Sequence, residues 1–160
     1  MSESLMLSTE QEGVILRQLS TETDDVAYWQ SVEANREHLS QFGDTTSQKY
    51  QSLEDVASAR QNAGNKLRMG IWAMEVFVGT INATPEGDEV EIGYWIDSRY
   101  TGHGYATLAA RSLARHLAPQ YSRVYAEVTN GNDASMAVLT KAGFQQTGIR
   151  HEQIIFELKD

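Results

Sequence analysis

Residues 99–119, RYTGHGYATLAARSLARHLAP, decide the fold, because a glycine-rich turn here leads directly into a long helical pattern. Apolar residues recur at spacings of three and four until Pro119 ends the pattern. These apolar residues are Ala106, Ala109, Ala110, Leu113, Ala114 and Leu117. The preceding residues 89–96, EVEIGYWI, alternate between two faces as a strand does. The stretch therefore predicts a strand, a glycine turn and a helix in succession.

Gly102 and Gly104 lie at the predicted start of that helix. The first N–H groups of a helix lack intrahelical partners and attract anions, and glycine lets the main chain approach a phosphate closely. The segment 98–126 contains arginines and no Asp or Glu, although the net charge of the chain is −9. The pattern favours a phosphate site, while a tight turn without a ligand would also explain the two glycines.

Two well-known phosphate loops fit the sequence poorly. A Walker loop is absent. A dinucleotide-binding turn would need a third glycine where Thr107 stands, after a strand that is apolar on both faces. A dinucleotide module therefore remains a distant alternative.

The composition of the chain limits which partners, cofactors and cellular locations we expect. A chain of 160 residues is long enough for one domain with its own core. It contains no cysteine, and its four histidines lack metal-ligand spacing, so we expect neither a disulfide nor a metal site. The acidic balance argues against a nucleic-acid partner, and no apolar run or leader pattern indicates a membrane span or secretion. A cytoplasmic protein is expected.

The rest of the chain predicts a single mixed α/β domain over residues 12–160, preceded by a flexible N-terminus over residues 1–11. Hairpins come early, and a strand–helix–strand crossover follows. The predicted strands are 13–19, 71–77, 78–84, 89–96, 123–129 and 151–158, with a turn at 85–88. The predicted helices are 23–39, 52–64, 105–118 and 132–143, with Ser52 and Asn132 as N-caps.

Three of these segments resemble the GCN5-related N-acetyltransferases. RYTGHGYA is similar to the R/Q-x-x-G-x-G/A signature, whose loop wraps the pyrophosphate of acetyl-coenzyme A. EVEIGYWID and NDASMAVLTKAGF resemble the RimJ/RimL branch, which acetylates N-termini of ribosomal proteins. The resemblance covers about residues 12–158. It implies an α/β (α+β) fold with one mostly antiparallel sheet that splays at residues 89–96, and acetyl-coenzyme A as cosubstrate without a metal.

The resemblance also implies which residues bind the cofactor. The main chain around Trp95, Ile96 and Asp97 would hold the pantetheine arm. Arg99 and His103 would assist at the loop, and Asn132 would contact the cofactor from the second crossover. The N–H groups expected at the pyrophosphate are those of Gly102, Gly104, Tyr105 and Ala106.

Acetyl transfer needs a base for the amine and a donor for the departing thiolate. Glu91 is the candidate base, although a solvated strand face would also explain it. Ser135 is the candidate donor, by resemblance to the RimL-type branch, although simple helix capping would explain it too. Many relatives use a tyrosine where Leu139 stands here. Without cysteine there is no acetyl-thioenzyme, so direct transfer in a ternary complex is expected.

The resemblance also implies an acceptor site between the first helices and the strand that bears Glu91, and Asn35, Arg36 and Phe42 occupy places where the RimJ/RimL branch has similar residues. Its candidate residues are Asn35, Arg36, Phe42, Trp72 and Tyr94. The acceptor is expected to be a protein or peptide α-amine. A small cationic amine, such as a polyamine or aminoglycoside, and a non-catalytic acyl-coenzyme A sensor remain alternatives. The chain would act as a monomer or a homodimer.

Overall fold

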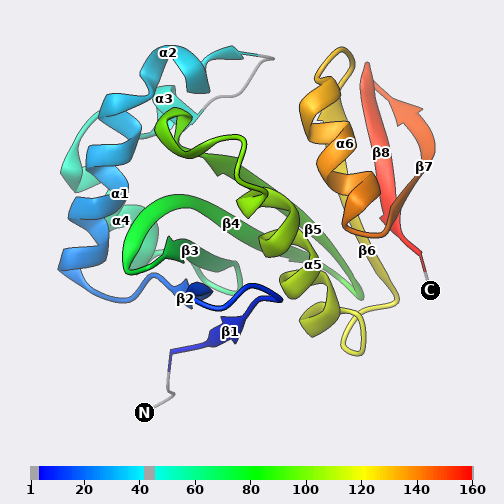
Figure 1. Ribbon diagram of the computed structural model, residues 1–160, viewed down its shortest axis with the longest axis horizontal. Helices are drawn as coiled ribbons and strands as arrows, with labels where there is room; N and C mark the ends of the chain where they lie inside the picture. Colours follow the sequence, from blue (N-terminus) through cyan, green and yellow to red (C-terminus); the bar gives the residue numbers. More distant parts are fainter. Residues whose placement is uncertain (1–3, 42–45, 160) are drawn as a thin grey trace.

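The computed structural model describes residues 4–41 and 46–159. Eight strands form one sheet in the order β1-β2-β3-β4-β5-β6-β8-β7 (Figure 1). They are β1 (Met6–Ser8), β2 (Val14–Gln18), β3 (Leu67–Ala73), β4 (Val76–Glu86), β5 (Glu89–Ile96), β6 (Arg123–Thr129), β7 (Phe144–Arg150) and β8 (Gln153–Leu158). Neighbouring strands are antiparallel except β5 and β6. The predicted mixed, mostly antiparallel sheet is confirmed.

Helices cover both faces of this sheet (Figure 1). They are α1 (Glu22–Ala34), α2 (Arg36–Leu39), α3 (Thr46–Lys49), α4 (Leu53–Gln61), α5 (Tyr105–Leu117) and α6 (Asp133–Lys141), with a short 3₁₀ turn at Ser98–Tyr100. Alternate residues of β5 point to opposite sides. Ile92 packs in the core beneath α5 and α6, whereas Trp95 packs with Tyr28 and Val32 of α1.

Helix ends follow the predicted chemistry. Ser52 caps α4 by accepting a hydrogen bond from Asp55 N, and Asn132 caps α6 by accepting one from Ser135 N. The helix predicted at 23–39 divides into α1 and α2, because Asn35 leaves the helical conformation (φ −124°, ψ 17°). α5 ends at Leu117, two residues before Pro119.

Several strand boundaries differ from the prediction. The strand predicted at 71–77 is wrong, because Met74 and Glu75 form a turn with φ values of 48° and 70° that separates β3 from β4. β4 runs through Pro85 and Glu86, so only residues 87 and 88 of the predicted turn 85–88 form a turn. β1, α3 and β7 were not predicted, and β1 falls within residues 1–11, the segment expected to be flexible.

Candidate active site

The glycine loop provides an open helix N-terminus. Gly102 and Gly104 have φ values of 83° and 79°, which favour glycine, and a Cβ built on either residue would meet nothing within 4 Å. α5 begins at Tyr105 without a side-chain cap and without an acidic residue in its first turn. The first N–H groups of α5 are therefore free to face an anion, and the loop fits a pyrophosphate.

A cavity of about 510 Å³, the first cavity, extends from this loop along the end of β5. It is lined by seven of the residues predicted to bind the cofactor: Trp95, Ile96, Gly102, Gly104, Tyr105, Ala106 and Asn132. α2 and α6 contribute further lining that sequence reasoning missed, namely His38, Leu39, Ala134, Val138 and Lys141. Short α2 carries no motif that would have indicated this role.

Asp97 and Arg99 do not line the first cavity. Instead, hydrogen bonds between them support the start of the glycine loop. The Asp97 carboxylate is fully buried and accepts hydrogen bonds from Ser31 Oγ (2.8 Å), Arg99 N (2.9 Å) and the Arg99 guanidinium (2.7 and 3.0 Å). Burial alone would raise the pKa of Asp97, but the hydrogen bonds from Arg99 and Ser31 outweigh it and lower the pKa to about 2. The Arg99 guanidinium is thus engaged by Asp97.

The side chain of Asn35 also serves the loop, although it was predicted to bind the acceptor. It is buried, its Nδ2 donates to Ser31 O (2.7 Å) and its Oδ1 accepts from Ser98 N (2.7 Å). Both hydrogen-bonding ends are therefore used to join α1 to the segment after β5. His103 is exposed and stacks on Tyr105 with ring centroids 5.4 Å apart.

The sheet opens between β5 and β6. These parallel strands pair only at residues 89–91 with 123–125. Beyond this pairing lies a second cavity of about 780 Å³, which is lined by β5, β6, α3 and α6 residues including Glu91, Glu127, Lys49 and Ser135. The splayed strand that the family resemblance implied is therefore present, and Glu91 lies at an open cavity rather than on a plain solvated face.

The pKa of the Glu91 carboxyl group lies above the ordinary value for glutamate. Burial raises its pKa, and the like charge of Glu127 raises it further. Glu127 was not among the residues predicted for the site. The signal in the sequence is the alternating pattern of residues 123–129, which places Glu127 on one face of a strand. That strand pairs in parallel with the strand that bears Glu91, so the two carboxylates lie near each other.

Tyr94 and Ser135 lie where the two cavities meet, since both residues line both cavities. Tyr94 comes from β5 and Ser135 from the first turn of α6, and their hydroxyl oxygens are 2.6 Å apart. Burial raises the pKa of the Tyr94 hydroxyl to about 12, although its hydrogen bond to Ser135 acts in the opposite direction. The donor that was predicted for the thiolate thus sits beside a protonated phenol.

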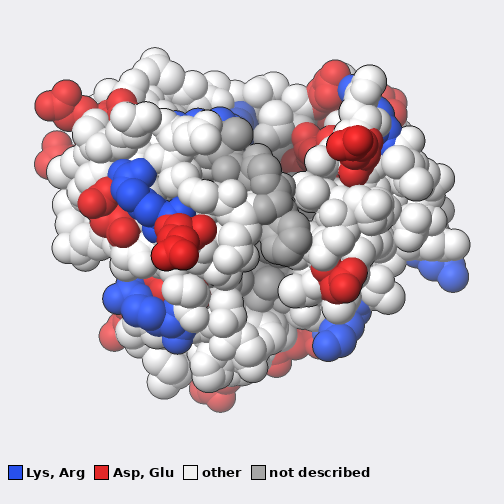
Figure 2. Space-filling model, turned by 90° about the horizontal axis from the view of Figure 1, so that it is seen from above, with Lys and Arg blue, Asp and Glu red and all other residues white. Residues whose placement is uncertain are grey.

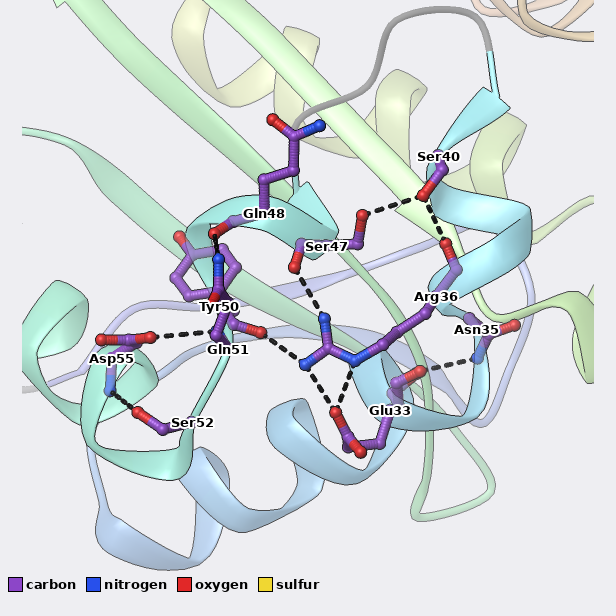
Figure 3. A network of polar contacts seen from close by, with 11 residues as sticks. Glu33, Asn35, Arg36, Ser40, Ser47, Gln48, Tyr50, Gln51, Ser52 and Asp55 are labelled. Carbon is purple, nitrogen blue, oxygen red and sulfur yellow. Dashed lines mark hydrogen bonds and ion pairs between the residues drawn. The ribbon is translucent and has the colours of Figure 1, made fainter.

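Arg36 and Trp72, which were predicted to contact the acceptor, line neither of the two cavities. Figure 3 shows Arg36 bound to the Glu33 carboxylate and to the carbonyl oxygens of Ser47 (2.6 Å) and Tyr50 (2.8 Å), which joins α1 to α3. Trp72 packs between Phe77 and the Arg17 guanidinium. Phe42, another predicted acceptor residue, lies outside the described residues.

The described residues contain no cluster of three or more His, Cys, Asp or Glu side chains that could hold a metal ion. Within the same part of the chain, no helix combines the length and apolar character needed to cross a membrane. On the face shown in Figure 2, acidic and basic side chains lie interspersed among uncharged ones.

The comparisons with known proteins agree with this geometry. A family model described as an acetyltransferase (GNAT) domain matches residues 14–145. The chain therefore belongs to the GNAT acetyltransferase family. It is an acetyltransferase, as its motifs predicted. No curated protein matches the sequence.

Solved structures with the same fold include RimJ/RimL-type enzymes. RimL, a ribosomal L7/L12 alpha-N-protein acetyltransferase in complex with coenzyme A, superposes with a TM-score of 0.82 at 20% identity, over 94% of this chain and 96% of that chain. Mycobacterium smegmatis RimJ in complex with a CoA-disulfide gives 0.79 at 24% identity, over 97% and 86%. An acetyl transferase from Salmonella typhimurium that modifies the N-terminal serine of L7/L12 gives 0.78 at 20%, over 98% and 100%.

Proposed function

We propose that this chain transfers an acetyl group from acetyl-coenzyme A to the α-amine at the N-terminus of a protein or peptide. The observation that carries the proposal is the meeting of two cavities at Ser135 and Tyr94. The first cavity starts at the uncapped N-terminus of α5, and the second is lined by two carboxylates. A thioester and an amine could therefore approach each other from opposite sides.

The first cavity suits acetyl-coenzyme A. The N–H groups of Gly104, Tyr105 and Ala106 would face its pyrophosphate, and the main chain of residues 95–97 would flank the pantetheine arm. The thioester supplies an acetyl group that is activated for attack. Asp97, Arg99 and Asn35 would act indirectly, because they fix the loop to β5 and α1 before the cofactor arrives.

The transfer can be written as one displacement. Glu91, directly or through a water molecule, takes a proton from the acceptor ammonium so that the nitrogen lone pair can attack. The new C–N bond forms as the C–S bond breaks, and the C–S electron pair leaves on sulfur. The Ser135 hydroxyl donates a hydrogen bond to that thiolate. The amide nitrogen then releases its second proton to solvent, and solvent protonates the thiolate, so that the products are the neutral amide and the thiol of coenzyme A. The chain contains no cysteine that could carry the acetyl group, which supports direct transfer.

The acceptor is assigned from charge and from fold relatives. Glu91 and Glu127 in the second cavity would attract a cationic amine. Three structures of the same fold belong to RimL, RimJ and an enzyme that modifies an N-terminal serine, which supports a peptide α-amine. A small cationic amine is the second candidate, since the same two carboxylates would attract it as well.

Release of coenzyme A from acetyl-coenzyme A tests the proposal. The acceptors are peptides with free Ser, Ala or Thr N-termini, the same peptides with blocked N-termini, a peptide with only a lysine amine, and spermidine. Turnover is expected with free N-termini and not with the blocked peptides. Turnover with spermidine alone would favour the second candidate. Binding of acetyl-coenzyme A without turnover on any amine would favour a sensor.

A further inference from the structure

The hydroxyl hydrogens of Tyr94 and Ser135 can point in only a few directions, which the neighbouring oxygen atoms determine. Tyr94 Oη lies 2.6 Å from Ser135 Oγ and 3.3 Å from the Ser135 carbonyl oxygen. The carbonyl oxygen can only accept, whereas the two hydroxyl groups can each donate or accept. Which hydroxyl donates therefore decides where the Ser135 hydrogen points.

The distances place the hydrogen bond between the two hydroxyl groups, and their chemistry favours Tyr94 as the donor to Ser135 Oγ, because a phenol O–H is more acidic than an aliphatic O–H. An O–H···O bond of 2.6 Å lies within the normal range, whereas 3.3 Å lies beyond it. The phenol also remains protonated throughout the neutral range, because burial raises its pKa to about 12. With Tyr94 donating, Ser135 Oγ accepts one hydrogen bond, and its own hydrogen is left for a partner in the space where the two cavities meet.

We propose that Tyr94 is a positioning residue that directs the Ser135 hydroxyl hydrogen toward the departing sulfur. This inference rests on the proposed function, since it assumes that the thioester lies in the first cavity. The Tyr94 phenol keeps its proton throughout. The sulfur leaves with the C–S electron pair, and the Ser135 O–H, polarised by the bond from Tyr94, stabilises the thiolate.

Neighbouring side chains hold this pair in place. The Ser135 backbone N–H donates to Asn132 Oδ1 (3.3 Å), which fixes the first turn of α6. Tyr94 packs against the core beneath α5 and α6. Leu139, one turn further along α6, is fully buried and has no hydroxyl group, so it cannot form a hydrogen bond with Ser135.

The direct test is the pKa of the thiol of bound coenzyme A. Coenzyme A labelled with ¹³C at the methylene next to sulfur is titrated by NMR while bound to the full chain. The bound thiol is expected to have a pKa below that of free coenzyme A, and both Tyr94→Phe and Ser135→Ala are expected to remove most of that shift. Tyr121→Phe is the control, since Tyr121 is a partly buried tyrosine that lines neither cavity.

A kinetic readout complements the titration. Tyr94→Phe is expected to lower kcat about tenfold, the effect of one hydrogen bond, with little change in KM for acetyl-coenzyme A. In the Ser135→Ala background the same change is expected to have no further effect. Tyr94→Phe removes one oxygen, and urea unfolding of each variant checks that the fold is retained.

The outcomes separate this inference from the proposed function. A thiol pKa in Tyr94→Phe equal to that of the unmodified chain would overturn the role of Tyr94. A shifted thiol pKa that depends on Tyr94, in a chain that acetylates no peptide, would support this inference and contradict the proposed acceptor. Failure of coenzyme A to bind the unmodified chain would overturn both.

Discussion

The buried carboxylate of Asp97 accepts a hydrogen bond of 2.8 Å from the hydroxyl of Ser31, which joins the end of β5 to α1. The same carboxylate holds Arg99, and Asn35 holds Ser98. The start of the glycine loop is thus fixed to α1, which lies on the face of the sheet opposite α5. A loop fixed in this way loses little entropy when a ligand binds.

Replacement of Asp97 by Asn should weaken both the fold and the cofactor site. Asn cannot accept all of the hydrogen bonds that the carboxylate receives, so we expect the free energy of unfolding to fall by about 2 kcal/mol. The Kd for coenzyme A should rise. Urea unfolding and calorimetry measure the two effects. Glu10→Gln is the control, because its ion pairs with Arg111 and Arg115 are exposed, and we expect a loss below about 1 kcal/mol.

The contribution of Asp97 should also depend on pH. Its pKa is lowered from 3.8 to about 2 by folding, so its stabilising effect is present above about pH 4 and is lost as the pH falls toward 2. The difference in unfolding free energy between the unmodified chain and Asp97→Asn should therefore be constant from pH 5 to 7 and shrink below pH 4. A difference that does not change with pH would contradict this account of Asp97.

The glycines of the loop should matter for binding more than for stability. Gly104→Ala forces a side chain into a positive φ, which should cost about 1 kcal/mol, and places a methyl group in the open space at the helix N-terminus. We expect a higher Kd for coenzyme A. Gly87→Ala is matched, since Gly87 has φ +64° and equally open surroundings in the β4–β5 turn. Equal losses of affinity in both variants would argue against a phosphate at the loop.

Glu91→Gln should lower turnover about 100-fold at neutral pH, because the acceptor amine then loses its base. The loss should shrink as the pH rises above the pKa of the amine, which then arrives neutral. Initial rates from pH 6 to 10 measure this trend. Glu89→Gln is the control on the same face of β5, where Glu89 pairs with Arg123 at 3.0 Å. Unchanged turnover in Glu91→Gln would remove Glu91 as the base.

We expect Glu127 to influence the pKa of Glu91, the proposed base. Its negative charge raises the pKa of Glu91, so Glu127→Gln should lower this pKa and move the acid limb of the kcat/KM profile to lower pH. A shift to higher pH, or no shift, would show that Glu127 does not act on Glu91.

The sequence was sufficient for the centre of the fold. Alternation in 89–96, the glycine turn and the helical pattern after it are local features, so β5, the loop and α5 could be predicted. The Met74–Glu75 turn could not, because neither residue belongs to the types that usually adopt positive φ in a hairpin turn. β1 and β7 contain exposed and polar residues, since each lies at an edge of the sheet.

The cofactor half of the site could be predicted from the sequence better than the acceptor half. The cofactor half rests on contiguous main chain, and seven predicted residues line the first cavity. The acceptor half depends on side chains that tertiary contacts bring together. Asn35 and Arg36 matched the family by position, but their hydrogen bonds hold the loop and α3 instead. The pairing of Tyr94 with Ser135 joins residues 41 positions apart and left no local trace in the sequence.

Mass spectrometry of the acetylated product tests the central claim most directly. The acceptor is a peptide with a free N-terminal serine and one internal lysine, incubated with acetyl-coenzyme A and the unmodified chain. Fragmentation is predicted to place the acetyl group on the α-nitrogen of the serine. An acetyl group on the lysine side chain, or no acetylated peptide when acetyl-coenzyme A binds, would contradict the assignment of a peptide N-terminus as the acceptor.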